Sequence, residues 1–245
     1  MAKALPLDQI EVFDNNNKPH PSFDFGSAGI LLINKPQTWT SFDVVKYVRS
    51  RLKTRKVGHA GTLDPMAEGL LILCSGRATK SISEIQEMPK TYIGEVTFGG
   101  STPSYDADSD VDVEAPFEHI TLEMIEKALK DEFSGDIQQV PPMYSALKRD
   151  GQRLYDLARR GKTVELEPRP VTIYEHQVLE FNGNKLLLSI TCSKGTYIRS
   201  IAHDLGITLG SRAHLSKLIR TSIGTFTSAN ALTPSEIDEL LRSND

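Results

Sequence analysis

This chain is poor in cysteine, the residue that cross-links small extracellular domains. Among its 245 residues there are only two cysteines, and tryptophan is also rare, with one residue. The cysteines, Cys74 and Cys192, lie far apart inside apolar segments, which is typical of small buried residues and excludes a disulfide framework or a cysteine-rich metal site. We therefore expect a reducing, cytoplasmic environment.

Long apolar segments are also missing. No run approaches the roughly 18 residues that would suggest a membrane span, and the N-terminus lacks the apolar core of a secretion signal. There is no internal repeat, no low-complexity tract, and no glycine-rich dinucleotide or P-loop motif. The six histidines are scattered without metal-ligand spacing. We therefore expect neither a membrane-embedded nor a secreted protein, and no metal site.

Neither sign of charge dominates, but the charges are unevenly distributed. The net charge is −4, and 24% of the residues are charged, as in ordinary soluble proteins. An acidic loop contains Asp106, Asp108, Asp110, Asp112 and Glu114. It separates two basic segments, the first with Lys46, Arg49, Arg51, Lys53, Arg55 and Lys56, the second with Lys194, Arg199, Arg212, Lys217 and Arg220. Such segments favour contacts with a phosphate backbone, although a basic helix face can also be simply solvated.

The order of expected elements favours a mixed α/β (α+β) fold with a sheet flanked by helices. Residues 1–28 are polar and are expected to form an N-terminal extension, so the globular domain would cover 29–245. Apolar patterns predict strands at 29–34, 70–74, 91–98, 171–181, 185–192 and 223–226, the fourth and fifth forming a hairpin. Periodicity and capping motifs predict helices at 44–52, 121–133, 152–160, 200–205 and after Thr233.

The segment GHAGTLDPMAEG, from Gly58 to Gly69, places one carboxylate in a setting suited to positioning. Glycines on both sides of Asp64 allow close backbone approach or unusual dihedral angles, and Pro65 restricts the backbone that follows. An apolar run then enters what should be a buried strand. Asp64 is thus a candidate nucleophile or charge stabiliser. The alternative is that Asp64 caps a short helix beginning at Pro65.

A second candidate group is the segment CSKGTYIR, which ends at Arg199. In an extended chain Tyr197 and Arg199 project to the same side. A guanidinium there would keep Asp64 ionised and oriented, because a carboxylate removed from water keeps its charge only when it is paired. The alternative is that Tyr197 belongs to the core and Arg199 is an ordinary surface charge.

Several separate segments resemble the motifs of the TruB-type tRNA pseudouridine 55 synthases. In family order they are GILLINKP, GHAGTLDPMAEGLLILCSGRATK, KTYIGEVTFG, VPPMYSALKRDGQRLYDLARRG, CSKGTYIRSIAHDLG and AHLSKLIRTSIG. The resemblance implies the pseudouridine-synthase catalytic fold, with a central mixed, largely antiparallel sheet. It also implies the isomerisation of one T-loop uridine of tRNA, bound through the T-arm stem-loop, without a cofactor. We expect the protein to be a monomer.

By motif position, the resemblance implies roles for individual residues. Asp64 is the expected catalytic aspartate, Tyr92 stacks on the target base, and Arg199 is the partner of Asp64. Tyr197 and Leu218 are expected to shape the pocket, and His59 to lie near the flipped nucleotide. Lys35 and Pro36 are expected to help build the wall of the site.

The chain departs from a common bacterial pattern near its end. Bacterial members of the family commonly carry a C-terminal PUA domain, whereas about twenty residues follow Phe226, too few for such a domain. We therefore expect no PUA domain, and we expect its tRNA contacts to be absent or replaced, for example by residues 1–28. The difference also weighs against the guide-RNA-dependent relatives.

Uridine isomerisation leaves three routes open for Asp64. Its carboxylate can add to C6 of uracil, attack the anomeric carbon, or stabilise an oxocarbenium-like sugar. Two other functions compete with the isomerase. One is a T-arm-binding protein that assists tRNA folding without chemistry. The other is a metal-dependent glycosyl-transfer enzyme or hydrolase that uses Asp106 and Asp108, although a single DxD motif is a weak indication of a metal.

Overall fold

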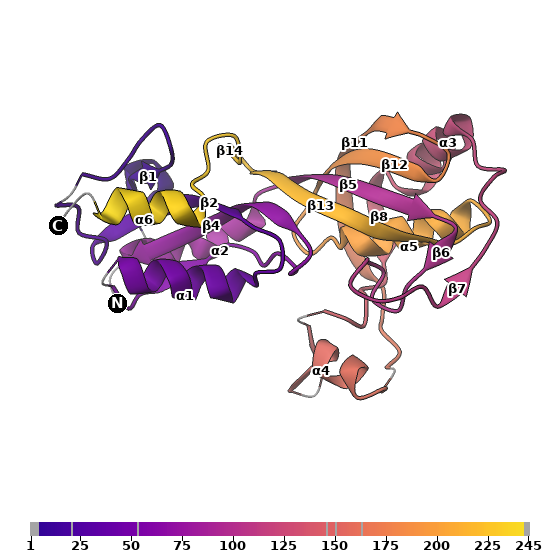
Figure 1. The fold of residues 1–245 in the computed structure, drawn as a ribbon, viewed down its shortest axis with the longest axis horizontal. Helices are drawn as coiled ribbons and strands as arrows, with labels where there is room; N and C mark the ends of the chain where they lie inside the picture. The colour runs from indigo at the N-terminus through magenta and orange to yellow at the C-terminus, as the bar shows by residue number, and fades with distance from the viewer. Residues whose placement is uncertain are drawn as a thin grey trace. The chain divides into compact units, whose positions relative to one another are not determined.

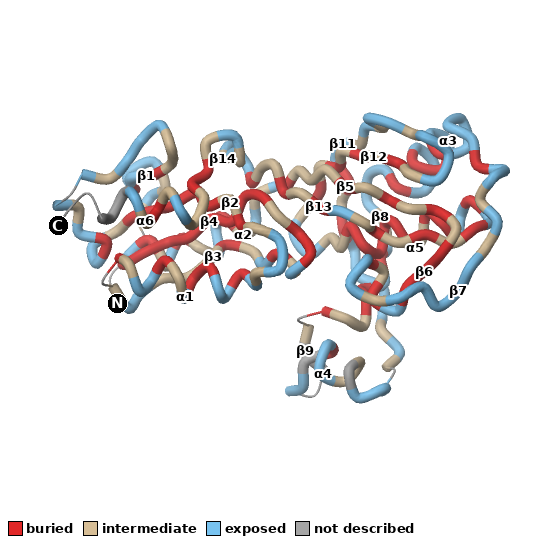
Figure 2. The backbone as a smooth tube through the Cα atoms, viewed as in Figure 1, coloured by how far each residue is buried: buried red, intermediate tan, exposed pale blue. Residues whose placement is uncertain are grey.

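The computed structural model describes residues 5–20, 22–52, 54–145, 147–149, 151–162 and 164–242. The chain forms two compact units. The first unit consists of Met1–Tyr92 and Ile219–Asp245, and the second of Ile93–Leu218. The chain passes from one unit to the other within strands β5 (Lys90–Phe98) and β13 (Ala213–Ile223), which are labelled in Figure 1. Each unit contains its own buried strands, as the burial colours in Figure 2 show.

The sheet of the first unit is built around two antiparallel strands, β2 (Ala28–Lys35) and β4 (Glu68–Gly76). The short strands β1 (Val12–Phe13) and β3 (Val57–His59) add to β2 and β4, respectively. The end of β13 lies parallel to β4, and β14 (Phe226–Thr227) folds back on β13. The predicted strand at 70–74 is confirmed, and all of its residues are buried.

Helix α1 (Ser41–Arg51) begins with the capping box that the sequence predicts. Thr40 Oγ1 accepts a hydrogen bond from Asp43 N, and the Asp43 carboxylate accepts one from Thr40 N. Thr40 Oγ1 also donates to Asp43 Oδ2 at 2.6 Å, and this bond, followed by the one from Thr40 N, lowers the pKa of Asp43. Other helical segments of the unit are η1 (Leu7–Gln9), η2 (Arg77–Ser81), α2 (Ile82–Glu87) and α6 (Pro234–Arg242).

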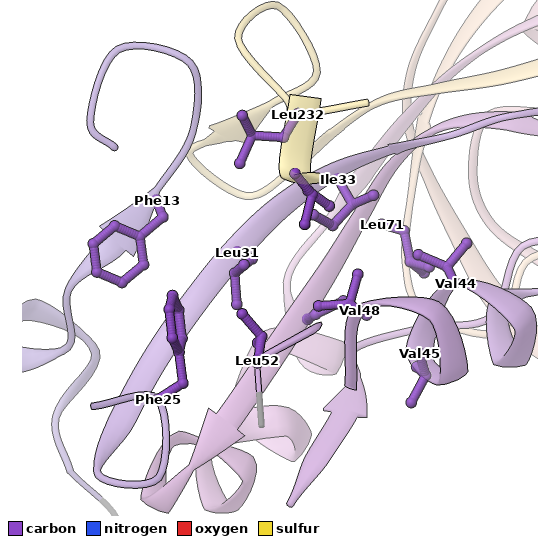
Figure 3. Close-up of a cluster of buried hydrophobic side chains, with 12 residues drawn as sticks. Phe13, Phe25, Leu31, Ile33, Val44, Val45, Val48, Leu52, Leu71 and Leu232 are labelled. Carbon is purple, nitrogen blue, oxygen red and sulfur yellow. The ribbon is translucent and has the colours of Figure 1, made fainter. Parts of the chain in front are cut away.

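The N-terminal residues contribute to the core of the first unit. Figure 3 shows Phe13 and Phe25 in the same apolar cluster as Leu31 and Val48. The sequence placed the start of the globular domain at Gly29, but the structure packs these earlier side chains inside. Periodicity could not find them because a polar segment separates the two phenylalanines. The two rings meet only in the folded chain, with their centroids 5.5 Å apart, and Phe13 is placed there by the pairing of β1 with β2.

The second unit contains the predicted hairpin. Strands β11 (Arg169–Phe181) and β12 (Lys185–Cys192) pair antiparallel, and Gly183 in their turn has a φ of 91°. Burial alternates along β12, as expected for a strand with one covered face. The other strands are β8 (Gly135–Gln139), which pairs with β11, and the short pairs β6 (Gly100–Ser101) with β7 (Val113–Glu114) and β9 (Lys148–Arg149) with β10 (Gln152–Arg153).

The helices of the second unit begin at slightly different residues than expected. Helix α3 (Leu122–Glu132) buries the predicted Ile125 and Leu129, but Leu122 is exposed. Helix α4 covers Leu154–Arg159, because the two preceding residues form β10. Helix α5 covers Ile198–Thr208 and thus begins before Ser200.

The strand expected at 223–226 differs most from the structure. Strand β13 instead begins at Ala213 and ends at Ile223, and β14 begins at Phe226. The sequence prediction was therefore wrong about most of the length of β13, and the predicted segment spans the turn between the two strands. Polar residues hid the strand, because Lys217 and Arg220 interrupt the apolar pattern of a sheet strand.

The fold is mixed α/β, as predicted. Among the described strand pairs, β1–β2 and β4–β13 are parallel and the others with an assigned register are antiparallel. In the described part of the chain, no helix is long and apolar enough to cross a membrane. Cys74 and Cys192 are buried, and burial raises the pKa of the Cys74 thiol to about 12.

Candidate active site

The chain around Asp64 forms a turn between two strands. Strand β3 ends at His59, β4 begins at Glu68, and Ala67 N donates a hydrogen bond to Asp64 O at 3.1 Å. The helix-capping alternative is therefore wrong, because the next regular element is a strand. Asp64 is partly exposed, so a substrate can reach it.

The backbone on both sides of Asp64 is fixed by hydrogen bonds. Ser41 Oγ donates to Leu63 O at 3.1 Å and accepts from Leu63 N at 2.8 Å. On the other side, Thr38 N donates to Pro65 O at 2.8 Å. The non-glycine residue Thr38 has a φ of 70°, a strained conformation that the surrounding contacts must hold. The main chain that carries the carboxylate is thus immobilised immediately before and after it.

Lys35 is a buried cation beside this turn. Its side chain is 0% exposed, and Nζ donates to Pro36 O at 2.8 Å, Trp39 O at 2.7 Å and Pro65 O at 3.4 Å. Lys35 and Pro36 therefore connect the end of β2 to the residue that follows Asp64. Their expected role in the wall of the site stays a prediction.

Arg220, on β13, is a second buried cation beside the turn. Its side chain donates from Nε to Leu70 O at 2.8 Å, from Nη2 to Gly61 O at 3.1 Å and from Nη1 to Thr62 O at 3.4 Å. The sequence placed Arg220 in a basic segment for phosphate contacts. As a surface contact this is wrong, because the residue is 1% exposed.

His59 lies at the end of β3, in the segment that leads to Asp64. Burial lowers the pKa of His59 below 6.5, against a smaller opposite effect of the Gly61 backbone, and the charge of Arg220 lowers it further. The imidazole is therefore neutral at physiological pH. A neutral ring suits packing near a base better than an ion pair with a phosphate.

Tyr92 lies on β5, as the sequence predicts. Gly94, Val96 and Phe98 are buried, and Tyr92 at the start of the same alternation is half-buried. The strand limits the movement of the ring, which suits a platform for a nucleobase. Its stacking role stays a prediction.

In the second unit, Arg199 lies in the first turn of a helix. Helix α5 begins at Ile198 and Tyr197 is its N-cap residue, so the expected extended arrangement of Tyr197 and Arg199 is wrong. The alternative of an ordinary surface charge is also wrong, because Arg199 is 3% exposed.

Arg199 forms an ion pair within its unit. Its Nη1 lies 3.2 Å from Asp106 Oδ2 and donates to Ser104 O at 2.9 Å, while Nη2 donates to Tyr144 O at 2.9 Å. Asp106 Oδ1 accepts from Ser104 Oγ at 2.6 Å and from Asp108 N at 3.1 Å. In the sequence Asp106 belongs to an acidic loop and, with Asp108, is a weak candidate metal ligand. Among the described residues, no group of three or more His, Cys, Asp and Glu could hold a metal ion. The implied pairing of Arg199 with Asp64 stays a prediction.

Gln139 fixes the backbone of Tyr197. Tyr197 N donates to Gln139 Oε1 at 2.8 Å, and Gln139 Nε2 donates to Tyr197 O at 3.1 Å. No sequence pattern selects Gln139, because only its burial, at 3% exposed, distinguishes it from other glutamines. Leu218 is buried, and a Cβ added at Gly94 would lie 3.7 Å from its Cδ1. The expected pocket roles of Tyr197 and Leu218 stay predictions.

The two basic segments differ in exposure. In the first segment Lys46, Arg49, Arg55 and Lys56 are exposed, whereas Lys53 lies outside the described residues. Its Arg51 donates to Asp238 Oδ1 at 2.6 Å and stacks on Tyr47. In the second segment Lys194 and Lys217 are exposed but Arg199 and Arg220 are buried. The first segment therefore offers more cations to a phosphate backbone.

Comparison with known sequences yields one family. The family model described as TruB family pseudouridylate synthase (N terminal domain) matches residues 49–198. A relative named tRNA pseudouridine synthase B from Parabacteroides distasonis is 48% identical over 227 residues, covering 90% of this chain and 96% of the relative. A relative of the same name from Dehalococcoides mccartyi is 47% identical over 204 residues, covering 83% of this chain and 68% of the relative.

Solved structures show the same fold. A structure described as a Cbf5-Nop10-Gar1 complex matches with a TM-score of 0.69 and 28% identity, covering 92% of this chain. A structure described as an H/ACA RNP bound to a substrate RNA containing 2′-deoxyuridine matches with a TM-score of 0.66 and 25% identity, also covering 92% of this chain. This chain spans 58% and 57% of those two chains, less than two thirds of their length.

Proposed function

Because this chain belongs to the TruB family of pseudouridylate synthases, we propose that it converts the T-loop uridine at position 55 of tRNA to pseudouridine. The name that its relatives share supports tRNA as the substrate. Within the molecule, the observation that carries the proposal is the turn around Asp64, where a partly exposed carboxylate stands on an immobilised main chain.

The reaction requires one bond to break and another to form. The bond between N1 of uracil and C1′ of ribose breaks, the base turns, and C5 bonds to C1′. The hydrogen on C5 leaves to solvent and N1 gains a proton, so atoms balance and no electrons are exchanged with a cofactor. Asp64 acts as an ionised carboxylate that adds to C6, attacks C1′, or stabilises a cationic sugar. All three routes need the fixed orientation that its main-chain contacts provide.

The base has to leave its stack before any of these steps. Unstacking a base costs a few kcal/mol, which an aromatic face and a fitted pocket offset. Tyr92 supplies the face in this proposal, neutral His59 packs near the nucleotide, and buried Leu218 helps to exclude water. Arg199 and Tyr197 complete the proposed pocket, with Arg199 oriented by Asp106.

The proposal also includes how tRNA is reached. Exposed Lys46 and Arg49 on α1, together with Arg55 and Lys56, would contact the phosphate backbone of the T-arm. We also propose that the protein works as a monomer in the cytoplasm, where thiols such as those of the buried Cys74 and Cys192 stay reduced.

Release of tritium from uridine labelled at C5 tests this function. Wild-type protein should release tritium from a T-arm stem-loop RNA and from whole tRNA, at full rate in the presence of a chelator. Asp64→Asn should bind the RNA with unchanged affinity but lose at least about 1,000-fold in rate. Substantial activity of Asp64→Asn would contradict the role of the carboxylate. RNA binding without release by wild-type protein would favour a T-arm-binding protein, and loss of activity in chelator would favour a metal-dependent enzyme.

A further inference from the structure

Arg220 is a buried cation to which the proposed chemistry assigns no role, and its burial excludes the phosphate contact expected from its basic segment. It lies on β13, paired in parallel register with Gly69 on β4, and its side chain is 1% exposed. A buried guanidinium costs several kcal/mol unless its donors are satisfied. Packing alone would be served at lower cost by an apolar residue of similar volume. The charge and the donors therefore require another explanation.

The hydrogen bonds of Arg220 reach both ends of the turn that carries Asp64. Gly61 O and Thr62 O lie before Asp64, and Leu70 O lies after it in β4. The three acceptors are separated from Arg220 by about 150 positions in the chain. One planar side chain thus joins the entry and the exit of the turn.

The glycines on either side of Asp64 fit around Arg220. Gly61 has a φ of 99°, and a Cβ added there would lie 3.5 Å from Arg220 Nη1. Gly69 also has a φ of 99°, and its added Cβ would lie 2.4 Å from Arg220 O, closer than real atoms approach. Conformational freedom is one reason for glycine at these two positions. The structure adds a specific reason, because the backbone at Gly69 comes into direct contact with that of Arg220.

Arg220 also differs from an ordinary structural arginine in its partners. In the described part of the chain, its hydrogen-bond acceptors are main-chain carbonyls and no carboxylate forms an ion pair with it. Carbonyl dipoles satisfy the donors without cancelling the charge. The same charge contributes to the low pKa of His59, after the larger effect of burial, so its field extends over the segment before Asp64.

We propose that Arg220 is a positioning residue that holds the turn in the conformation from which the Asp64 carboxylate acts. This role rests on the proposed function of Asp64. Arg220 contacts no reacting atom in this proposal; it acts through the main chain of Gly61, Thr62 and Leu70. A displacement of the turn by about 1 Å is enough to slow a catalysed step about 100-fold.

The test compares Arg220→Met and Arg220→Lys with a variant that weakens the same unit elsewhere. Val48→Ala removes buried volume from the core under α1, shown in Figure 3, without touching the turn. At equal folded fraction, Arg220→Met should lower the single-turnover rate on T-arm RNA about 100-fold, while the RNA dissociation constant changes less than about threefold. Arg220→Lys keeps the charge and should recover part of the rate. Val48→Ala should keep the wild-type rate.

A second readout does not depend on activity. Amide hydrogen exchange should become at least about tenfold faster in residues 60–70 of both Arg220 variants, with little change in residues 41–51. Should Arg220→Met fail to fold, Arg220→Lys decides by the same two readouts. Equal rates for the Arg220 variants and Val48→Ala, or unchanged exchange in the turn, would overturn the proposal. An inactive wild-type protein would overturn the proposed function instead, and exchange would still show whether Arg220 holds the turn.

Discussion

Arg199 and Arg220 are buried arginines in different units, and their charges are balanced in different ways. Arg199 is 3% exposed and forms an ion pair with Asp106 at 3.2 Å. Arg220 is 1% exposed and donates to three main-chain carbonyls. Both side chains satisfy hydrogen-bond donors that would otherwise be costly to bury. Only the first meets a carboxylate in its own unit.

Arg199 is therefore oriented mainly by a charged partner, whereas Arg220 is oriented by the positions of main-chain carbonyls. The ion pair of Arg199 with Asp106 is neutral as a whole, and it orients the guanidinium toward Asp106. The carbonyls around Arg220 leave a positive charge within the first unit, beside the turn that carries a carboxylate. Perturbed pKa values cluster at functional sites, and the charge of Arg220 contributes to the lowered pKa of His59 in the segment before Asp64.

The largest expected effect comes from removing the carboxylate of the neutral pair. Asp106→Leu removes the carboxylate that pairs with the buried Arg199 guanidinium and should lower the free energy of unfolding by about 3–5 kcal/mol. The double variant Asp106→Leu with Arg199→Met should recover most of this loss, because the guanidinium that Asp106 balances is then removed as well. Urea denaturation followed by circular dichroism measures both values.

Asp108 provides the control for this pair. Its side chain is exposed, so Asp108→Leu should change the free energy of unfolding by less than about 0.5 kcal/mol. If Asp106→Leu cost no more than Asp108→Leu, the ion pair would not stabilise the second unit. The contrast with Arg220 would then disappear.

A glycine pair tests the shape of the turn in the first unit. Gly69 and Gly183 have φ values of 99° and 91°, but only Gly69 faces the backbone of Arg220. Gly183→Ala should cost about 1–2 kcal/mol for its backbone conformation. Gly69→Ala should cost about 3 kcal/mol, since the added Cβ also collides with Arg220 O. Equal losses by thermal denaturation would show that the contact with Arg220 is easily relaxed.

Local elements were predictable from the sequence. The capping box of α1 and the turn of the β11–β12 hairpin follow from residues that are neighbours in the chain. Asp64 was found through the glycines and proline around it and through the resemblance of its motif. Whether Asp64 begins a helix could not be decided locally, since Asp followed by Pro is compatible with a helix start. The pairing of β4 with β2 decides it.

The partners of buried polar groups were not predictable. Arg220 looked like a surface cation because its acceptors, such as Leu70 O, lie far away in sequence. Asp106 looked like a metal ligand because its ion pair with Arg199 forms only in the folded second unit. Periodicity reports which face of an element is apolar. It does not report which distant carbonyl or carboxylate will meet a charge on that face.

The smallest expected effect concerns Asp204, a carboxylate on the same helix as Arg199. Burial raises the pKa of Asp204 from 3.8 to about 6. The folded state therefore holds the proton more tightly than the unfolded state. The stabilisation from this group is fully present below about pH 4 and is lost as the pH rises through 6.

Asp204→Asn should remove this pH dependence. At pH 7 the variant should be more stable than wild type by about 1 kcal/mol, a value reduced for the partial exposure of the side chain. Below pH 4 the two proteins should have the same stability, because the carboxyl is then neutral in both states. Denaturation curves across this range measure the difference. A variant that is less stable at pH 7 would mean that a cation stabilises the Asp204 carboxylate, as Arg199 does for Asp106. Burial would then not be the main influence on the protonation of Asp204.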